Sequence, residues 1–242
     1  MRYGLISDIH GNLEALDAVL KDLERERIDE YICVGDIVGY GANPRECIEA
    51  VKLLDPKILI AGNHEWGVLG LVGIDYFSED AAAGIVWTKR VLEKGELDYM
   101  RSFKLSGSIE DFTLVHGSLD EPAKFNYISD NSDAYKTMKL SRTPLCFVGH
   151  THVPGIFYAD EHRVARSPDF SVNLDRSRKY LINIGSIGQP RDGDPRASFA
   201  IYDTKAGSVE IKRSAYDIGQ AQGKILKAGL PPRLAERLAE GR

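Results

Sequence analysis

The chain has 242 residues, of which 43% are hydrophobic, so it can bury a large core, and we expect a single domain over residues 1–242. Its formal net charge of −5 excludes a diffuse positive field, so neither nucleic acid nor an anionic membrane is expected as a stable partner. The first residues leave no room for a signal peptide, and no segment reaches the roughly 20 apolar residues that span a bilayer, which favours a cytoplasmic protein. The cysteines form no CxxC pair and are expected to be reduced and buried; they are Cys33, Cys47 and Cys146.

The first sixty residues alternate short apolar runs with amphipathic segments. Residues 5–6, 31–34 and 57–60 are short apolar runs that predict strands. Between them, leucine and valine recur at helical spacing over residues 13–23 after Asn12, a good N-cap, and a second helix is predicted over residues 44–54. This βαβ order implies parallel strands, whose carboxyl ends form a common edge where ligands bind in open α/β sheets.

The pattern of predicted helices and strands changes near residue 150. Before that point the pattern predicts helix over residues 78–103 and strands over residues 112–115 and 145–148. After it, short strands separated by Gly, Pro and Asp turns predict a mostly antiparallel second sheet, and two helices finish the chain. The predicted strands are residues 155–158, 180–184, 197–202 and 208–213, and the predicted helices are residues 218–227 and 233–240.

Five polar clusters follow the five early strands, and they contain five of the six histidines. If these strands share one sheet, their carboxyl ends bring the clusters together. Residues i and i+2 of an extended chain point to the same side, so Asp8 can act with His10, and His150 with His152. The clusters are Asp8-Ile9-His10, Gly35-Asp36, Gly62-Asn63-His64-Glu65, His116-Gly117 and Gly149-His150-Thr151-His152.

Carboxylates and imidazoles gathered at one edge are unfavourable unless a positive charge joins them. A bound metal ion supplies that charge. Mixed oxygen and nitrogen ligands without thiolate suit Mn²⁺, Fe or Zn²⁺ better than Ca²⁺, and they argue against a closed structural zinc site. The pattern therefore predicts a catalytic metal site.

The ordered series of clusters resembles the signature of the calcineurin-like metallophosphoesterases over residues 1–152. Residues 183–191, with the sequence NIGSIGQPR, and the later Gly229-Leu230-Pro231 look like the bacterial and archaeal phosphodiesterase branch, which is related to diadenosine tetraphosphatases. The resemblance implies an α/β fold, a four-layer α/β/β/α sandwich of two mixed β-sheets flanked by helices.

The resemblance also implies a role for each residue of the clusters. Asp8, His10 and His152 would hold one divalent ion, Asn63, His116 and His150 the other, and Asp36 would bridge both. Mn²⁺ is the first expectation for both ions, with Fe, Zn²⁺, Ni²⁺ or Co²⁺ as alternatives. Such a pair of ions activates a shared water that attacks phosphorus in line, and the catalytic residues would be Asp36 and His64. His64 would donate a proton to the leaving oxygen or stabilise the phosphate charge, whereas Glu65 either acts there or caps locally.

Two departures from the family pattern concern the groups around the phosphate. In the protein-phosphatase relatives the second motif reads Gly-Asp-x-x-Asp-Arg-Gly, whose later Asp orients the histidine and whose Arg grips phosphate. Here Gly39 and Tyr40 stand at those positions, which weakens the case for a phosphoprotein phosphatase and leaves open what orients His64. Many relatives in the closer branch carry Pro-Arg after the fourth motif, where this chain has Leu119-Asp120.

Several residues have two interpretations at this stage. Arg191 either binds phosphate or pairs with Asp192 or Asp194 at the surface. Asn63 is a candidate substrate contact as well as a ligand, and Asn12 either contacts substrate or only caps its helix. Three aromatic residues either stack on a nucleobase or, as we expect, pack in the core: Phe125, Tyr127 and Tyr135. His162, beside acidic neighbours, is expected to be exposed.

The leading hypothesis is a dinuclear-metal-dependent hydrolase of a small phosphodiester or phosphomonoester substrate, with a nucleotide as one candidate. A dinucleoside polyphosphate hydrolase is the most specific version, and a phosphoprotein phosphatase is a further alternative. A non-catalytic scaffold with this fold is disfavoured because all seven ligand types and His64 are present. An RNA-processing nuclease needs a basic groove, which the acidic composition does not indicate. The sequence leaves the oligomeric state open.

Overall fold

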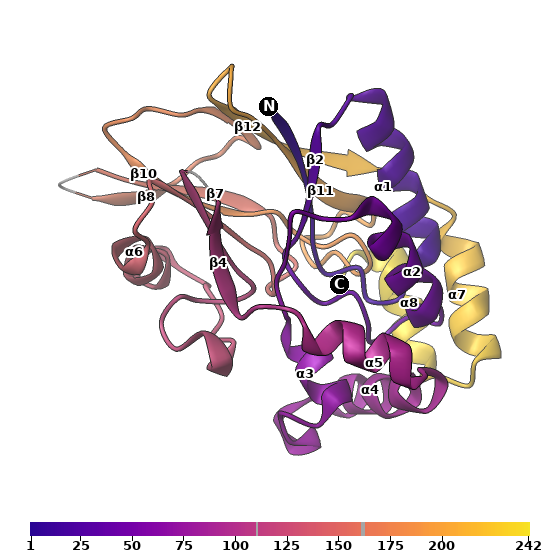
Figure 1. Ribbon diagram of the computed structural model, residues 1–242. Helices are drawn as coiled ribbons and strands as arrows, with labels where there is room; N and C mark the ends of the chain where they lie inside the picture. Colours follow the sequence, from indigo (N-terminus) through magenta and orange to yellow (C-terminus); the bar gives the residue numbers. More distant parts are fainter. Residues whose placement is uncertain (110, 161–162) are drawn as a thin grey trace.

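The protein is described here from a computed structural model that covers residues 1–109, 111–160 and 163–242 (Figure 1). The strands of these residues form two mixed sheets of six strands each. In the first sheet, β1 pairs in parallel with β2 and antiparallel with β11. Its strands are, in spatial order, β3 (Ile58–Leu59), β2 (Glu30–Cys33), β1 (Arg2–Ile6), β11 (Ala197–Asp203), β12 (Ser208–Ser214) and β9 (Ser171–Asn173).

The second sheet also mixes the two directions. β6 pairs in parallel with β5, and β10 lies between β6, to which it is parallel, and β7, to which it is antiparallel. Its strands are, in spatial order, β4 (Ser106–Ile109), β5 (Phe112–Val115), β6 (Leu145–Val148), β10 (Lys179–Asn183), β7 (Gly155–Ala159) and β8 (Val164–Arg166).

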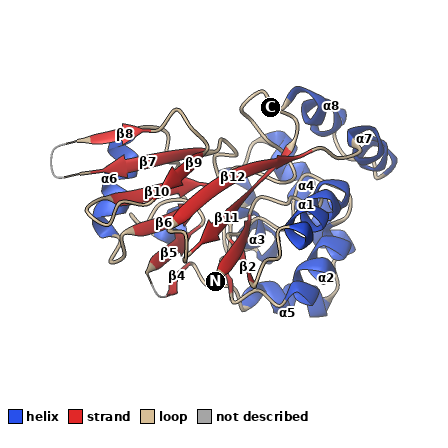
Figure 2. Cartoon of the chain, turned by 90° about the horizontal axis from the view of Figure 1, so that it is seen from above, coloured by secondary structure: helices blue, strands red, loops and turns tan. Residues whose placement is uncertain are grey.

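Helices cover the outer face of each sheet. Most of them lie on the side of the first sheet, and α6 lies on the opposite side of the molecule (Figures 1 and 2). None of the helices in the described ranges is both long and apolar enough to cross a bilayer. The helices are α1 (Leu13–Arg25), α2 (Pro44–Leu54), α3 (Asn63–Leu69), α4 (Glu79–Val91), α5 (Lys94–Arg101), α6 (Asn131–Leu140), α7 (Ile218–Lys227) and α8 (Pro232–Glu240), with 3₁₀ turns at Ile74–Tyr76 and Pro122–Lys124.

The alternation of side chains along the strands builds the layers. In β1, Leu5 belongs to the apolar layer between the two sheets, whereas Ile6 packs in the cluster with α1 and α2. In β6, Phe147 joins the layer between the sheets and Val148 packs with Met138 of α6. Strands that are buried on both faces need helices outside both sheets. The four-layer arrangement of two mixed sheets is thus confirmed.

The expectation that the five early strands share one sheet is wrong. β1, β2 and β3 lie in the first sheet, whereas β5 and β6 lie in the second. The later strands are divided between the two sheets and do not form an antiparallel sheet of their own, because β10 pairs in parallel with β6. An apolar run reports that a strand is buried, but its neighbours depend on packing between residues far apart in the chain.

Most predicted helices are present, with two local differences. The helical pattern over residues 78–103 forms two helices, because Glu93 and Glu96 make a capping box that starts α5. The sequence pattern did not predict α3, which begins at Asn63 inside one of the polar clusters. A short helix therefore starts where the sequence predicted only a strand end.

Candidate metal centre

The predicted clusters meet although their strands belong to different sheets. Asp8 and Asp36 follow β1 and β2 of the first sheet, and His116 and His150 follow β5 and β6 of the second. Asp36 Oδ2 lies 3.1 Å from His116 Nε2, so the carboxyl ends of the two sets of parallel strands face one another. The centre is therefore formed by the ends of both sheets.

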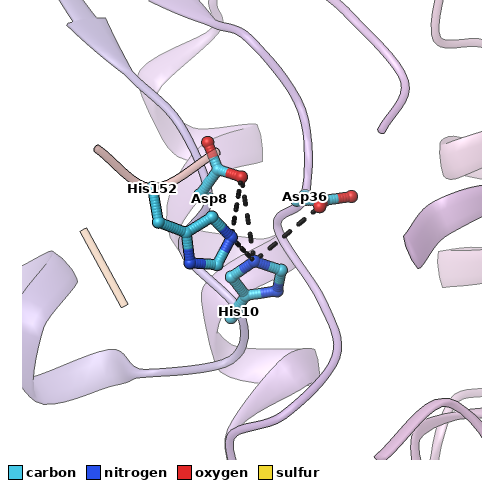
Figure 3. Close-up of side chains that lie close together, drawn as sticks. All are labelled: Asp8, His10, Asp36 and His152. Carbon is cyan, nitrogen blue, oxygen red and sulfur yellow. Dashed lines mark hydrogen bonds and ion pairs between the residues drawn. The ribbon is translucent and has the colours of Figure 1, made fainter. Parts of the chain in front are cut away.

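A first group of potential metal ligands consists of Asp8, His10, Asp36 and His152, all of them buried (Figure 3). His152 Nε2 lies 3.2 Å from Asp8 Oδ1 and 3.0 Å from His10 Nε2. His10 Nε2 lies 3.7 Å from Asp36 Oδ2. One ligand atom from each residue falls within 4.8 Å of the others, which is close enough for all four to share an ion.

A second group consists of Asp36, His116 and His150. Asp36 thus belongs to both groups, at the position that the family resemblance gives to the bridging carboxylate. The rings of His116 and His150 are 4.9 Å apart. Asn63 lines the same cavity as Asp36 and His150, and its buried Oδ1 has no hydrogen-bond partner among the described residues. The carboxylates and imidazoles of the two groups are those that the resemblance named, whereas Asn63 stays a predicted ligand.

Backbone carbonyl groups orient three of the imidazole rings. The Nδ1 atoms of His10, His116 and His152 lie 3.0, 2.8 and 2.6 Å from backbone oxygens of Val38, Val34 and Gln189. A carbonyl oxygen can only accept, so each Nδ1 carries the hydrogen, and in the neutral form of each ring Nε2 presents a lone pair to the centre. This arrangement of the outer nitrogen is the usual one for histidines that bind metal.

The backbone of the centre is strained. Five of the candidate ligands have φ between 51° and 67°, in the left-handed region, which costs about 1–2 kcal/mol for each residue with a side chain. Such conformations persist where surrounding contacts enforce them, and they concentrate at functional sites. The five residues are Asp8, His10, Asp36, His150 and His152.

Glu65 holds one of these strained segments in place. Its carboxylate accepts hydrogen bonds of 2.9, 2.7 and 2.8 Å from the backbone N–H groups of Asp36, Ile37 and Gly62. Burial, followed by the charge of Asp36, raises the pKa of Glu65 to about 7. Of its two interpretations, local capping is the one that these hydrogen bonds support.

The electrostatics of the centre favour ionised carboxylates and, with one exception, neutral imidazoles. Burial alone would raise the pKa of Asp8, but the neighbouring His152 and His116 outweigh it and hold the pKa below its usual value. Burial, followed by the charge of His116, lowers the pKa of His150 to about 3. For His116, burial acts downward but Asp36 and Asp8 raise the pKa to about 10. A bound cation would compete with the His116 proton, because metal ligands must be deprotonated.

His64 is held by packing, and no carboxylate of the described residues bonds to its Nδ1. Its ring centroid lies 4.6 Å from those of His10 and Tyr40 and 5.5 Å from that of Phe77. A Cβ atom on Gly39 would overlap His64 Nδ1, so the glycine makes room for the ring. Burial lowers the pKa of His64 to about 4, which keeps the ring neutral at pH 7. The question of what orients His64 is thus answered by close packing.

A cavity of about 470 Å³ opens onto the centre. Arg191 lines it together with Asp36 and His64. The two acids that could have drawn Arg191 to the surface are occupied elsewhere, since Asp192 pairs with Arg213, and Asp194 lies 2.7 Å from Arg196. Arg191 therefore faces the cavity, which leaves it free to bind an anion.

Tyr40 holds Arg191 in this position. Arg191 Nη2 donates to the Tyr40 hydroxyl at 3.1 Å and to Gln189 Oε1 at 2.9 Å. The guanidinium group also lies 5.7 Å from the centre of the Tyr40 ring. At the place where protein-phosphatase relatives carry an arginine, this chain has a tyrosine that supports an arginine from elsewhere.

The structure shows the surroundings of the remaining predicted residues. Asn12 is buried away from the cavity: its Oδ1 accepts from Ala15 N and its Nδ2 donates to Gly188 O, so the structure supports capping only. Phe125 is buried as expected, but the core assignment is wrong for Tyr127 and Tyr135, which are 52% and 49% exposed. His162 lies outside the described residues.

Sequence reasoning named Tyr127 as a candidate for stacking on a nucleobase but missed Arg237, and both residues line the cavity. Tyr127 stacks on His150, with ring centroids 4.1 Å apart, and Arg237 reaches the cavity from α8. Arg237 belongs to no recognisable motif, and it lies 85 residues beyond His152, the last residue of the clusters. The helical pattern of residues 233–240 predicted the helix but carried no signal for the cavity that it lines.

The chain belongs to the calcineurin-like phosphoesterase superfamily, whose domain model matches residues 1–207. A metallophosphoesterase of Sphaerobacter thermophilus with a known crystal structure is 40% identical, with a TM-score of 0.86 over 100% of both chains. An uncharacterised protein of Methanocaldococcus jannaschii is 42% identical over 242 residues, 98% of this chain and 97% of that one. A hypothetical protein of Pyrococcus horikoshii OT3 is 22% identical with a TM-score of 0.81 over 100% of this chain and 98% of that one, which shows a shared fold.

Proposed function

We propose that the protein is a phosphoesterase that uses two divalent metal ions to hydrolyse a small phosphodiester or phosphomonoester. The observation that carries this proposal is the position of Asp36, whose carboxylate is common to two buried groups of metal-ligating atoms. Asp8, His10 and His152 would complete the first ligand set, and Asn63, His116 and His150 the second.

The residues present fit such a pair of ions. Asn63 Oδ1 and His150 Nε2 are buried and find no hydrogen-bond partner within the described part of the chain. Buried polar atoms of this kind are rare unless a ligand or ion satisfies them. The donors are oxygen and nitrogen without thiolate, because all three cysteines are buried in the core, and this set suits Mn²⁺ first, with Fe, Zn²⁺, Ni²⁺ or Co²⁺ as alternatives.

Each group of the cavity has a task in phosphoester cleavage. Two divalent ions in this centre would lower the pKa of a water and neutralise charge on the phosphate oxygens. The Arg191 guanidinium matches the geometry of phosphate and would hold the ester in the cavity. His64 is neutral when the cavity is free. The negative charge of a bound phosphate would favour protonation of the ring, and the protonated ring would donate a proton to the leaving oxygen.

The cavity suits a small ester better than a phosphorylated protein. Its volume of about 470 Å³ falls in the usual range for small-molecule sites. Tyr76 and Tyr127 line it and are 48% and 52% exposed, so their rings are available to a nucleobase. A nucleotide ester is therefore the favoured substrate, and dinucleoside polyphosphates are the most specific candidates.

The test is a substrate panel on one metal-free preparation reloaded with Mn²⁺, Ni²⁺, Zn²⁺ or Mg²⁺. We expect turnover of p-nitrophenyl phosphate, bis(p-nitrophenyl) phosphate or diadenosine tetraphosphate, and elemental analysis should find two ions per chain. His64→Ala should lower kcat by about 10²–10⁴-fold and keep the metal. Asp36→Asn should lose both metal and turnover, whereas Asp98→Asn, at an exposed ion pair with Arg101, should change neither.

Failure of every ester with every metal would refute the proposal. Binding of a protein partner that survives Asp36→Asn and His64→Ala would then favour a scaffold. RNA cleavage with a steep salt dependence would favour a nuclease instead.

A further inference from the structure

The last two helices lie beyond the part of the chain that the family model matches, which ends at residue 207. α7 and α8 pack against each other and are visible side by side on the helical side of the molecule (Figure 2). Leu234 and Leu238 of α8 belong to an apolar cluster that also contains Tyr40 and Ala81. This cluster fixes α8 against the wall of the metal-centre cavity, because Tyr40 and Ala81 also line that cavity.

The end of α8 is also tied to the loop that carries Arg191. The backbone N–H of Gly193 donates to the carbonyl oxygen of Gly241 at 3.0 Å. A Cβ on Gly241 would lie 2.8 Å from Asp194 N, so the two segments are in close contact. Arg237 Nε donates to Arg242 O at 2.9 Å, which orients its guanidinium group. The end of the helix that carries Arg237 is therefore in direct contact with the loop that carries Arg191.

Neither arginine has a carboxylate partner within 4.0 Å among the described residues. Asp80, the acid of α4 that would be available to Arg237, lies 3.7 Å from Arg233 instead. Both guanidinium groups line the cavity that also contains His64 and His152. Two uncompensated positive charges facing one cavity repel each other, and a bound anion would remove that repulsion.

Two further features agree with an anion at this place. Burial, followed by the charge of Arg191, lowers the pKa of Arg237, as expected for neighbouring cations. The cavity also reaches Ser78, the N-cap of α4, and Ala81 in its first turn, where the helix dipole favours negative charge. A neighbouring cavity shares Arg237 but is also lined by four acids, so an anion is better placed on the Arg191 side; the acids are Glu79, Asp80, Glu236 and Glu240.

We infer that Arg237 and Arg191 form a second anion subsite beside the metal centre. The substrate is then a nucleotide ester with a second phosphate group: one phosphate is cleaved at the metal centre, and the other binds between the two arginines. This inference rests on the proposed phosphoesterase function. It adds a specificity residue from a helix outside the family domain, and it favours polyphosphorylated or bisphosphorylated nucleotides over simple monoesters.

The test compares matched substrates. Thymidine 5′-(p-nitrophenyl phosphate), the same ester carrying a 3′-phosphate, and diadenosine tetraphosphate are given to the wild-type holoenzyme, to Arg237→Gln and to Arg101→Gln. Arg101 is the control, because its side chain is 55% exposed and pairs with Asp98 of its own helix, α5. The quantity compared is the ratio of kcat/KM for a substrate with a second phosphate to kcat/KM for the singly phosphorylated ester. For at least one such substrate, Arg237→Gln should lower this ratio about tenfold or more, as expected for a lost charge-assisted hydrogen bond. Arg101→Gln should leave this ratio unchanged.

A second readout does not depend on turnover. Isothermal titration of the manganese-loaded protein should find adenosine 3′,5′-bisphosphate bound more tightly than adenosine 5′-monophosphate, and Arg237→Gln should remove the difference. The subsite is refuted if Arg237→Gln changes neither the kcat/KM ratio for any substrate nor the difference in binding. If no ester is hydrolysed but the difference in binding is present and depends on Arg237, the subsite stands and the phosphoesterase proposal fails.

Discussion

Gly39 provides the sharpest test of how this centre holds His64. Its φ of +96° is one that residues with a side chain rarely adopt. A Cβ there would overlap His64 Nδ1 and lie 3.0 Å from both Cγ and Cε1 of that ring. We expect Gly39→Ala to displace the imidazole, because the ring is enclosed on its other sides by Tyr40, His10 and Phe77.

The size of the effect follows from two separate costs. The left-handed backbone costs an alanine about 1–2 kcal/mol. The overlap with His64 adds about 1–3 kcal/mol, as for other overpacked sites. The free energy of unfolding should therefore fall by about 2–5 kcal/mol, and kcat should fall by about 10²-fold or more if the ring leaves its place.

Denaturant unfolding and steady-state kinetics measure these two quantities. Gly207→Ala is the matched control, because Gly207 has φ +63° and an added Cβ would find nothing within 4 Å. It should show the backbone cost alone and no change in kcat. Gly39→Ala in a His64→Ala background should likewise fall to the backbone cost, because the overlap is gone. An equal stability cost with and without the His64 ring would refute the packing argument.

Three other predictions concern different parts of the centre and core. In calorimetry, addition of Mn²⁺ should raise the Tm of the metal-free protein but not the Tm of Asp36→Asn. An ion that binds only the native state, present at 100 times its Kd, stabilises that state by about 2.7 kcal/mol. Glu65→Ala should lower the free energy of unfolding by at least about 3 kcal/mol in denaturant titrations, because four buried backbone N–H groups lose an acceptor. The three thiols should react with an aromatic disulfide reagent only after unfolding, since Cys33, Cys47 and Cys146 are all 0% exposed; rapid labelling of the native protein would contradict the assigned core.

The sequence by itself determined the chemical identity of the centre. Asp8, Asp36, His116 and His150 each follow a short apolar run, and that association is local, so it can be read without knowing which strands are neighbours. Asn12 is similar, because a side chain before an amphipathic run caps that helix through its own nearby backbone. The grouping of the ligands into two sets came from the family resemblance and agrees with the geometry.

Tertiary structure decided everything that depends on contacts between distant residues. The division of the early strands between two sheets, and the place of β10 between β6 and β7, follow from packing that no local pattern encodes. The reason for a glycine at position 39 is visible only in the folded protein, where the His64 ring fills the space of a Cβ atom. Arg237 enters the cavity beside Arg191 only because α8 is fixed on Tyr40 and Ala81. Local periodicity predicts whether a residue is buried. Which residue it contacts depends on packing between segments that are far apart in the sequence.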